Sequence, residues 1–139
     1  MDSSNQDLKK EYRVSCHCGK VGASITAPAH IVAWDCNCSV CQMKKNTHFV
    51  VPEANFTLDE ASKEFITTYT FNTHVAKHTF CSVCGVQAFY RPRSNPDGYG
   101  ITLWCVTPQP DSVEIKRFDG QQWEEYYAGE GAAIKAFSK

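Results

Sequence analysis

The 139-residue chain lacks any long hydrophobic run and any excess of charge of one sign. No stretch approaches the roughly 20 apolar residues of a membrane-spanning helix, and the polar start, MDSSNQDLKKEY, lacks the apolar core of a secretory signal. Fourteen Lys and Arg nearly balance fifteen Asp and Glu, which argues against a nucleic-acid or polyanion surface. We therefore expect a cytoplasmic or nuclear protein that is not secreted, contacts no membrane and binds no nucleic acid.

Internal repeats, low-complexity tracts and linkers are also absent from the sequence, and helical patterns are few. We expect a disordered segment over residues 1–11 and a single zinc-binding domain over residues 12–139. Short β-branched and aromatic runs separated by turn residues predict a mainly β fold of short antiparallel sheets. The runs are Val21–Thr26, His30–Asp35, His48–Val51, Phe65–Phe71, Val75–Phe80, Val86–Tyr90, Tyr99–Trp104 and Val113–Phe118. Helical turns are expected at Cys38–Lys44, near Asp59–Lys63, and after Asp119-Gly120 in a piece carrying Trp123 and Tyr126.

Cysteine is abundant, and seven of the eight cysteines fall into three clusters. In a reducing compartment, clustered cysteines indicate metal ligands rather than disulfides, although the even count is compatible with disulfides. A closed zinc site takes four ligands, so seven cysteines suggest one structural site and a second site with an open position. The clusters are Cys16-x-Cys18, Cys36-x-Cys38-x-x-Cys41 and Cys81-x-x-Cys84.

Two of the clusters are each followed directly by glycine. Gly19 and Gly85 can adopt positive φ, which lets following backbone N–H groups point back at the sulfurs. A redox dithiol has the same C-x-x-C spacing, but it normally opens a helix, whereas this one lies between strand-like segments. Pairing the two clusters gives a Cys₄ site, although spacing alone does not fix that pairing. His17, between two ligands, is expected to be exposed.

The third cluster supplies three ligands from six residues, which leaves the fourth position to another segment, to water or to substrate. Three thiolates on a zinc ion give a net charge of about −1, so such a site activates water poorly but can accept a soft sulfur ligand. The cluster therefore favours thiol substrates over hydrolysis. Alternatively, Cys105, His48 or His74 supplies the fourth ligand and closes the site. For Cys105, the simpler interpretation is a small apolar residue in or near a strand.

Other polar residues carry weaker signals. His30, His74 and His78 lie in no motif, so surface or ordinary hydrogen-bonding roles are expected for them. The loop Arg91–Pro96 either holds an anionic ligand through Arg and Asn or is a solvated turn.

The order C-x-C, C-x-C-x-x-C and C-x-x-C-G resembles the glutathione-dependent formaldehyde-activating enzyme family, and within it the centromere protein V type. The likeness spans Tyr12 to Tyr126 and is carried by the stretches Asp35–Cys41, Thr67–His74, Cys81–Gln87 and Arg91–Pro96. It implies a β-tent-like fold around a structural zinc and a carbon–sulfur lyase that joins glutathione and formaldehyde into S-hydroxymethylglutathione. It also implies two zinc ions per chain, a structural one on Cys16, Cys18, Cys81 and Cys84 and a catalytic one on Cys36, Cys38 and Cys41.

The leading hypothesis is an enzyme that binds a small thiol such as glutathione at the open zinc and adds its sulfur to a small aldehyde, or cleaves the same bond. Beyond the zinc ligands, only His48 and Arg93 are candidates for catalysis, because their segments can flank the site. The alternative is a non-catalytic, zinc-stabilised interaction module with nuclear or cytoskeletal protein partners. An accessible second site favours the enzyme, and a closed one favours the module.

Overall fold

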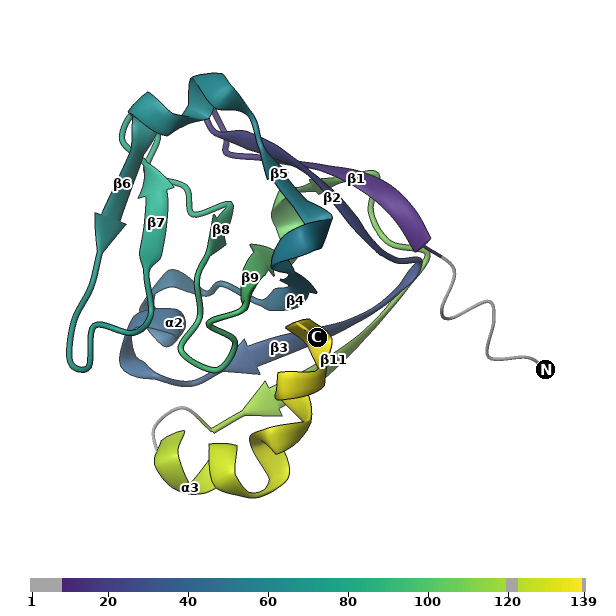
Figure 1. The fold of residues 1–139 in the computed structure, drawn as a ribbon, viewed down its shortest axis with the longest axis vertical. Helices are drawn as coiled ribbons and strands as arrows, with labels where there is room; N and C mark the ends of the chain where they lie inside the picture. Colours follow the sequence, from purple (N-terminus) through teal and green to yellow (C-terminus); the bar gives the residue numbers. More distant parts are fainter. Residues whose placement is uncertain (1–8, 120–122, 139) are drawn as a thin grey trace.

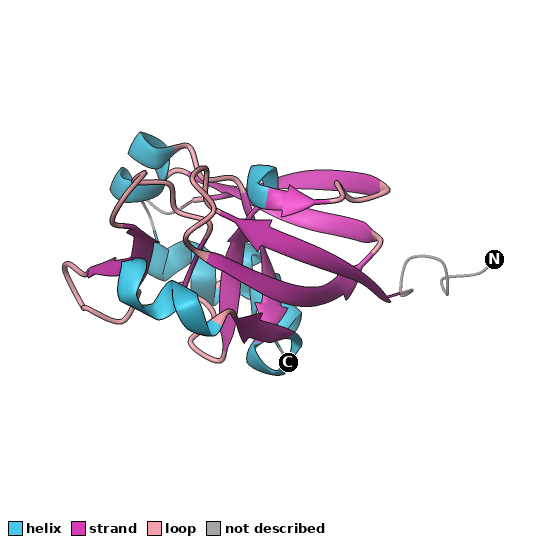
Figure 2. Ribbon diagram, turned by 90° about the horizontal axis from the view of Figure 1, so that it is seen from above, coloured by secondary structure: helices cyan, strands magenta, loops and turns pink. Residues whose placement is uncertain are grey.

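The computed structural model describes residues 9–119 and 123–138, and strands dominate it, as predicted (Figures 1 and 2). The first sheet has the order β10 (Val106–Thr107), β1 (Lys9–Ser15), β2 (Gly22–Pro28), β5 (Phe56–Leu58). The second has the order β11 (Ser112–Phe118), β3 (His30–Cys36), β4 (His48–Pro52), β9 (Gly98–Thr102), β8 (Phe89–Tyr90). A separate pair consists of β6 (Ile66–Tyr69) and β7 (His78–Cys81).

Helical segments are short. The α-helices are α2 (Ser39–Lys44) and α3 (Trp123–Ala128), and the 3₁₀ segments are η1 (Glu53–Asn55), η2 (Glu60–Phe65), η3 (Leu103–Cys105) and η4 (Glu130–Ser138). The three helical turns expected from the sequence correspond to α2, η2 and α3. Gly120 and the side chain of Tyr126 lie outside the described part of the chain.

The main core lies between the two large sheets. Along β1, the buried Tyr12 and Val14 alternate with the exposed Glu11 and Arg13, as expected for a strand with one solvated face. The inward residues of β1 and β2 pack in one cluster with side chains of the five-stranded sheet, among them Ile31, Ala33, Phe49, Val51 and Ile101. This core holds the strand ends that carry several of the cysteines.

The five-stranded sheet is covered on its other face as well. Val50, between the inward Phe49 and Val51, packs in a second cluster with Trp34, Phe118 and Ile134. These side chains come from β4, β3, β11 and η4, and Figure 1 shows α3 and the C-terminal turns beside β3 and β11. Burial on both faces explains why β4 reads as a continuous apolar run rather than an alternating one.

The structure differs from the sequence-based expectations at two places. Residues 9–11, expected to precede the folded part, form the beginning of β1. The second difference is that β11 pairs with β3 in parallel, with Ser112 opposite His30 and Phe118 opposite Cys36. The parallel pairing brings the carboxyl ends of both strands to one place, beside Cys36.

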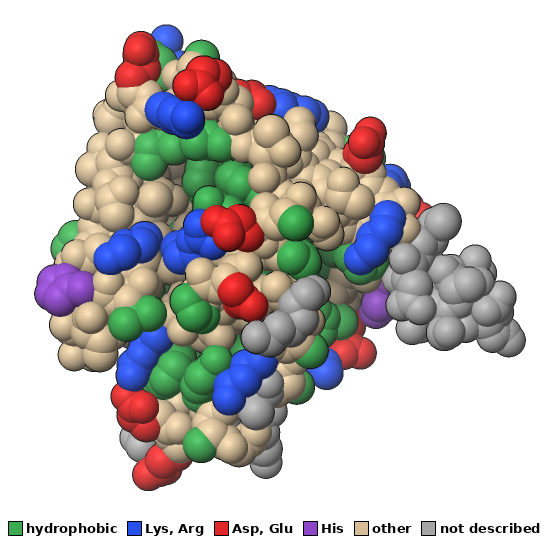
Figure 3. Space-filling view, viewed as in Figure 1, with side chains coloured by type: hydrophobic (Ala, Val, Ile, Leu, Met, Phe, Trp, Pro, Cys, Tyr) green, Lys and Arg blue, Asp and Glu red, His purple; other side chains and the backbone are tan. Residues whose placement is uncertain are grey.

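Charged side chains are spread over the surface. Basic and acidic groups are interspersed on the face shown in Figure 3, without a patch of one sign. Within the described residues, none of the helices has the length and apolar character needed to cross a membrane.

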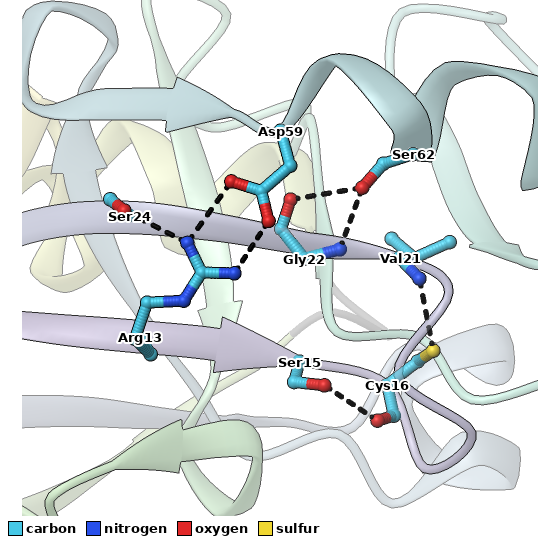
Figure 4. A network of polar contacts seen from close by, with 8 residues as sticks. All are labelled: Arg13, Ser15, Cys16, Val21, Gly22, Ser24, Asp59 and Ser62. Carbon is cyan, nitrogen blue, oxygen red and sulfur yellow. Dashed lines mark hydrogen bonds and ion pairs between the residues drawn. The ribbon is translucent and has the colours of Figure 1, made fainter.

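A polar network fixes the turn between β1 and β2 to η2 (Figure 4). The hydroxyl of Ser62, which is buried, accepts a hydrogen bond from the Gly22 N–H at 2.8 Å and donates one to the Gly22 carbonyl at 3.1 Å. Nearby, Arg13 and Asp59 form an ion pair at 2.5 Å whose two side chains are about half exposed. The network ends at Cys16, whose sulfur accepts a hydrogen bond from the Val21 N–H at 3.3 Å.

The two parts of this network should differ in their effect on stability. Ser62→Ala leaves the buried Gly22 N–H without its hydroxyl acceptor, so we expect a loss of about 2 kcal/mol. Asp59→Asn removes only an exposed pair and should cost less than about 1 kcal/mol. The hydrogen bond from Arg13 lowers the pKa of Asp59, so this small contribution is present at neutral pH and is lost as the pH falls through the folded-state pKa. Urea unfolding at pH 7 measures both, and an equal cost would contradict the assignment.

Candidate metal centres and the adjoining cavity

The structure brings two of the predicted cysteine clusters together. The sulfurs of Cys16, Cys18, Cys81 and Cys84 all lie within 4.8 Å of one another. Two of the contacts measure 3.7 Å, between Cys16 and Cys18, and 3.6 Å, between Cys18 and Cys81. A tetrahedron with metal–sulfur bonds of about 2.3 Å places its sulfurs about 3.8 Å apart, whereas a disulfide needs about 2.05 Å. This group can therefore hold one metal ion such as zinc.

Backbone N–H groups approach these sulfurs, from Val83 and Cys84 before Gly85 as well as from Val86 after it. Gly19 and Gly85 have φ of 85° and 78°. The N–H groups of Val83 and Cys84 approach the sulfur of Cys81 at 3.4 and 3.5 Å. Hydrogen bonds from backbone N–H groups lower the pKa of Cys81, and that of Cys84 to about 6. Such donors favour the thiolate form that a metal needs.

The second group consists of Cys36, Cys38 and Cys41, whose sulfurs also lie within 4.8 Å of one another. Cys36 ends β3, Cys38 is the N-cap residue of α2, and Cys41 lies in that helix and is buried. The Cys38 sulfur accepts a hydrogen bond from the Cys41 N–H at 3.4 Å. A strand end and the first turn of a helix thus place three thiols around one point.

The three thiols share their protons unequally. Hydrogen bonds from Cys36 and Cys41 lower the pKa of Cys38 to about 2, whereas sharing a hydrogen bond with Cys38 raises the pKa of Cys36 to about 12. The pKa of Cys41 is raised as well, first by its hydrogen bond with Cys36. Without a metal the group thus favours one thiolate, and a metal ion would displace the remaining protons.

No fourth ligand joins this group within the described residues. Among the described His, Cys, Asp and Glu side chains, no further ligand atom lies within 4.8 Å of all three sulfurs. Cys105 instead packs against the main core and is influenced by Cys16 and Cys84, while burial raises its pKa to about 11. His74 is exposed and its Nδ1 lies 2.8 Å from the Thr70 hydroxyl.

His48 faces this site but has both ring nitrogens engaged. Its Nδ1 lies 3.1 Å from the Asn46 carbonyl, which can only accept, so Nδ1 carries the hydrogen. Nε2 then accepts from the Tyr90 hydroxyl, also at 3.1 Å. Burial lowers the pKa of His48 to about 4, so the ring is neutral at physiological pH. Tyr90 in turn contacts Cys41, and burial raises the pKa of its hydroxyl.

A cavity of about 60 Å³ adjoins the three cysteines. His48, His78 and Tyr90 line it together with the sulfurs, and Trp34, Phe118, Trp123 and Ile134 supply apolar walls. Two buried polar atoms of these lining residues have no hydrogen-bond partner in the described part of the chain, the Trp34 Nε1 and the His78 Nδ1. The cavity therefore combines thiols, apolar walls and unused hydrogen-bonding capacity, as ligand sites do.

An open groove of about 490 Å³ continues from the cavity. Cys38, His78, Arg93 and Trp123 line both spaces, and the turn Phe71–Thr73 forms another side of the groove. The Arg93 guanidinium stacks 3.7 Å from the Trp123 ring centroid and pairs with Glu124. Arg93, one of the two candidates named from the sequence, thus lies at the junction of the cavity and the groove.

The loop Arg91–Pro96 matches neither expectation as a whole. Arg93 faces the cavity, but Arg91 is bound to Glu53 and to the Tyr99 hydroxyl. Asn95 is fully buried, and its Nδ2 donates to the Ile134 carbonyl and the Ser138 hydroxyl. Asn95 is therefore neither a ligand for an anion nor part of a solvated turn.

Four residues that line the cavity were not predicted from the sequence as part of the site: His78, Tyr90, Trp34 and Ile134. His78 was expected at the surface or in an ordinary hydrogen bond, yet it is 3% exposed and lies in the wall of the cavity. Its position depends on β7 lying beside β8, where Lys77 pairs with Arg91 and His78 stacks on Tyr90, and no local spacing reveals that contact.

Residues 11–123 match the family model described as glutathione-dependent formaldehyde-activating enzyme. The chain belongs to this family. All seven clustered cysteines lie inside the formaldehyde-activating enzyme match, as do His48, His78 and Tyr90, whereas Ile134 lies beyond it. The closer likeness to the centromere protein V type stays a prediction.

The chain is also similar to a solved structure, that of a Rhodobacter sphaeroides protein. The two share 26% sequence identity with a TM-score of 0.63, over 75% of this chain and 99% of the other. This similarity supports the fold described above over the part that is covered.

Proposed function

We propose that this protein is a zinc-dependent enzyme that joins a small thiol, glutathione in the first place, to a small aldehyde such as formaldehyde. One zinc would be held by Cys16, Cys18, Cys81 and Cys84 as a closed structural site. A second would be held by Cys36, Cys38 and Cys41 beside the cavity. The observation that carries the proposal is this second group, because three sulfurs border a cavity and no fourth protein ligand in the described residues completes them.

The residues of the second site fit a zinc ion that keeps one open position. Three sulfurs at mutual distances below 4.8 Å match three corners of a thiolate tetrahedron. When bound there, zinc would act as a Lewis acid that lowers the pKa of an incoming thiol. Within the protein, His48 is neutral and hydrogen-bonded on both nitrogens, so we propose that it orients Tyr90 rather than acting as an acid.

The two adjoining spaces suit a peptide thiol. A cavity of about 60 Å³ has room for a thiol group and a one-carbon aldehyde, but it is far below the roughly 300–1,000 Å³ of whole-ligand sites. The groove of about 490 Å³ falls in that range and can hold the remainder of a tripeptide. Arg93 lies where the two meet, so its guanidinium can bind a substrate carboxylate.

A nearby cation, Lys44, would offset the negative charge of a thiolate-rich centre. Three cysteine thiolates and one zinc ion carry about −1, and a substrate thiolate adds a further negative charge. Lys44, three residues after Cys41 in α2, is electrostatically coupled to that cysteine. Its ammonium donates to Gln87 at 2.6 Å and lies 5.3 Å from the Phe80 ring centroid.

The proposed step conserves atoms and electrons. The thiol loses its proton, its sulfur forms a bond to the carbonyl carbon, and the C=O π pair moves onto the oxygen. That oxygen takes up one proton, so the net reaction is thiol plus aldehyde giving an S-hydroxymethyl adduct. The reverse reaction breaks the same carbon–sulfur bond.

Cys38→Ser should abolish this activity while leaving a folded protein with one metal fewer. Serine cannot replace a soft thiolate ligand, so only two of the three sulfurs would be left to hold the metal. Exchange NMR on glutathione–formaldehyde mixtures measures adduct formation with wild type, with Cys38→Ser and without protein. Elemental analysis and circular dichroism on the same samples report metal content and folding.

Cys105→Ser is the matched control, since this thiol joins neither group and should keep both metals and the exchange rate. A wild-type protein that fails to accelerate exchange and fails to bind glutathione in calorimetry would contradict the proposal. That result would favour the non-catalytic interaction module.

A further inference from the structure

His78 is held in one orientation by aromatic rings. Its imidazole stacks on Phe71 with ring centroids 5.5 Å apart and on Tyr90 at 5.3 Å, the latter with an interplanar angle of 14°. The side chain is 3% exposed and belongs to the walls of both the cavity and the groove, where Cys38 also lies. The ring therefore forms part of the wall beside Cys38, where a thiol and an aldehyde would meet.

This arrangement is unfavourable for stability alone. The Nδ1 of His78 is buried without a hydrogen-bond partner in the described part of the chain, and an orphaned polar group of this kind lowers the stability of a fold. A phenylalanine would fill the same stack without that cost. Residues that break a local rule of stability without compensation are characteristic of functional sites.

The ring also has the protonation state that a neutral donor needs. Burial lowers the pKa of His78, and the ammonium of Lys44 lowers it further. A neutral imidazole carries one N–H and can donate it to an oxygen on which negative charge develops, without first losing a proton to solvent.

Resting on the function proposed above, we propose that the imidazole N–H of His78 donates a hydrogen bond to the aldehyde oxygen as the carbon–sulfur bond forms. The oxygen gains the C=O π pair in that step, so a donor placed there stabilises the transition state more than the free aldehyde. His78 keeps its hydrogen throughout, and the protons released by the thiol and taken up by the oxygen exchange with water through the groove.

The test compares His78→Phe and His78→Gln with wild type, all loaded with zinc. Phenylalanine keeps the stacked ring but removes the donor, so we expect a loss of about 100-fold in adduct formation by exchange NMR. Glutamine retains an N–H and should give an intermediate rate. Glutathione affinity by calorimetry and zinc content should be unchanged, and His78→Phe should melt no lower than wild type. His30→Gln is the control, because that ring lies outside the cavity and contacts Ser112.

Three results would overturn the inference, and each is distinct. If wild type accelerates exchange and His78→Phe does so equally, His78 has no such role and the proposed function stands. If His78→Phe loses its activity together with glutathione affinity or zinc, the ring shapes the site and does not serve the oxygen. If wild type itself gives no acceleration, the proposed function fails and this inference fails with it.

Discussion

Cys81→Ser is expected to give a chain that no longer folds. Cys81 is fully buried in the main core, and its sulfur lies 3.6 Å from that of Cys18, which is 63 residues away in sequence. A metal at this group would join β7 to the turn after β1. Structural zinc binding in small peptides is worth roughly 10–16 kcal/mol, which is comparable to the roughly 5–15 kcal/mol stability of a typical domain. A variant that no longer holds this metal should therefore lose most or all of its stability.

The comparison with Cys38→Ser makes this expectation specific. Far-UV circular dichroism and elemental analysis should show an unfolded or insoluble Cys81→Ser protein, but a folded Cys38→Ser protein with one metal equivalent fewer. Cys16→Ser should behave as Cys81→Ser does, because both side chains are buried in the same group. If all three variants unfold alike, both cysteine groups are structural and the enzyme proposal weakens sharply.

The cysteine groups could be anticipated because their geometry is largely local. A C-x-C or C-x-x-C segment followed by glycine forms a turn whose sulfurs converge, and the positive φ of Gly19 and Gly85 agrees with that reasoning. The strand β1 could have been anticipated as well, since Tyr12 and Val14 alternate with Glu11 and Arg13. This alternation of apolar and charged residues is present in the sequence, although the charged residues of the solvated face make it hard to recognise.

The remainder of the site depends on pairings between distant segments. His78 enters the cavity wall because β7 lies beside β8, where Lys77 pairs with Arg91, and Phe118 reaches it because β11 lies parallel to β3 beside Cys36. Neither pairing leaves a local spacing signal, since each is selected by burial across the whole fold. The Arg91–Pro96 loop shows the same limit of prediction from sequence. Its run of polar residues does not reveal that Asn95 is buried while Arg93 lines the cavity.

Asn95→Ala should be among the most destabilising polar substitutions in the chain. The Asn95 side chain is fully buried, donates to the Ile134 carbonyl at 2.9 Å and the Ser138 hydroxyl at 2.8 Å, and accepts from Ser94 at 2.8 Å. Alanine would remove these three hydrogen bonds and leave a void where the amide was. We expect a loss of roughly 3–5 kcal/mol in urea unfolding.

The consequence should extend to the cavity, because Asn95 fastens the segment that carries Ile134. With that anchor gone, η4 should lose hydrogen-exchange protection before the β-sheets do. Ser138→Ala also removes the hydrogen bonds from Ser138 to Asp97 and to the Lys135 carbonyl, but it keeps the bond from Asn95 to the Ile134 carbonyl, so it should cost less than Asn95→Ala. Equal losses from the two variants, or an Asn95→Ala protein in which η4 stays as protected as in wild type, would contradict the anchoring role of Asn95.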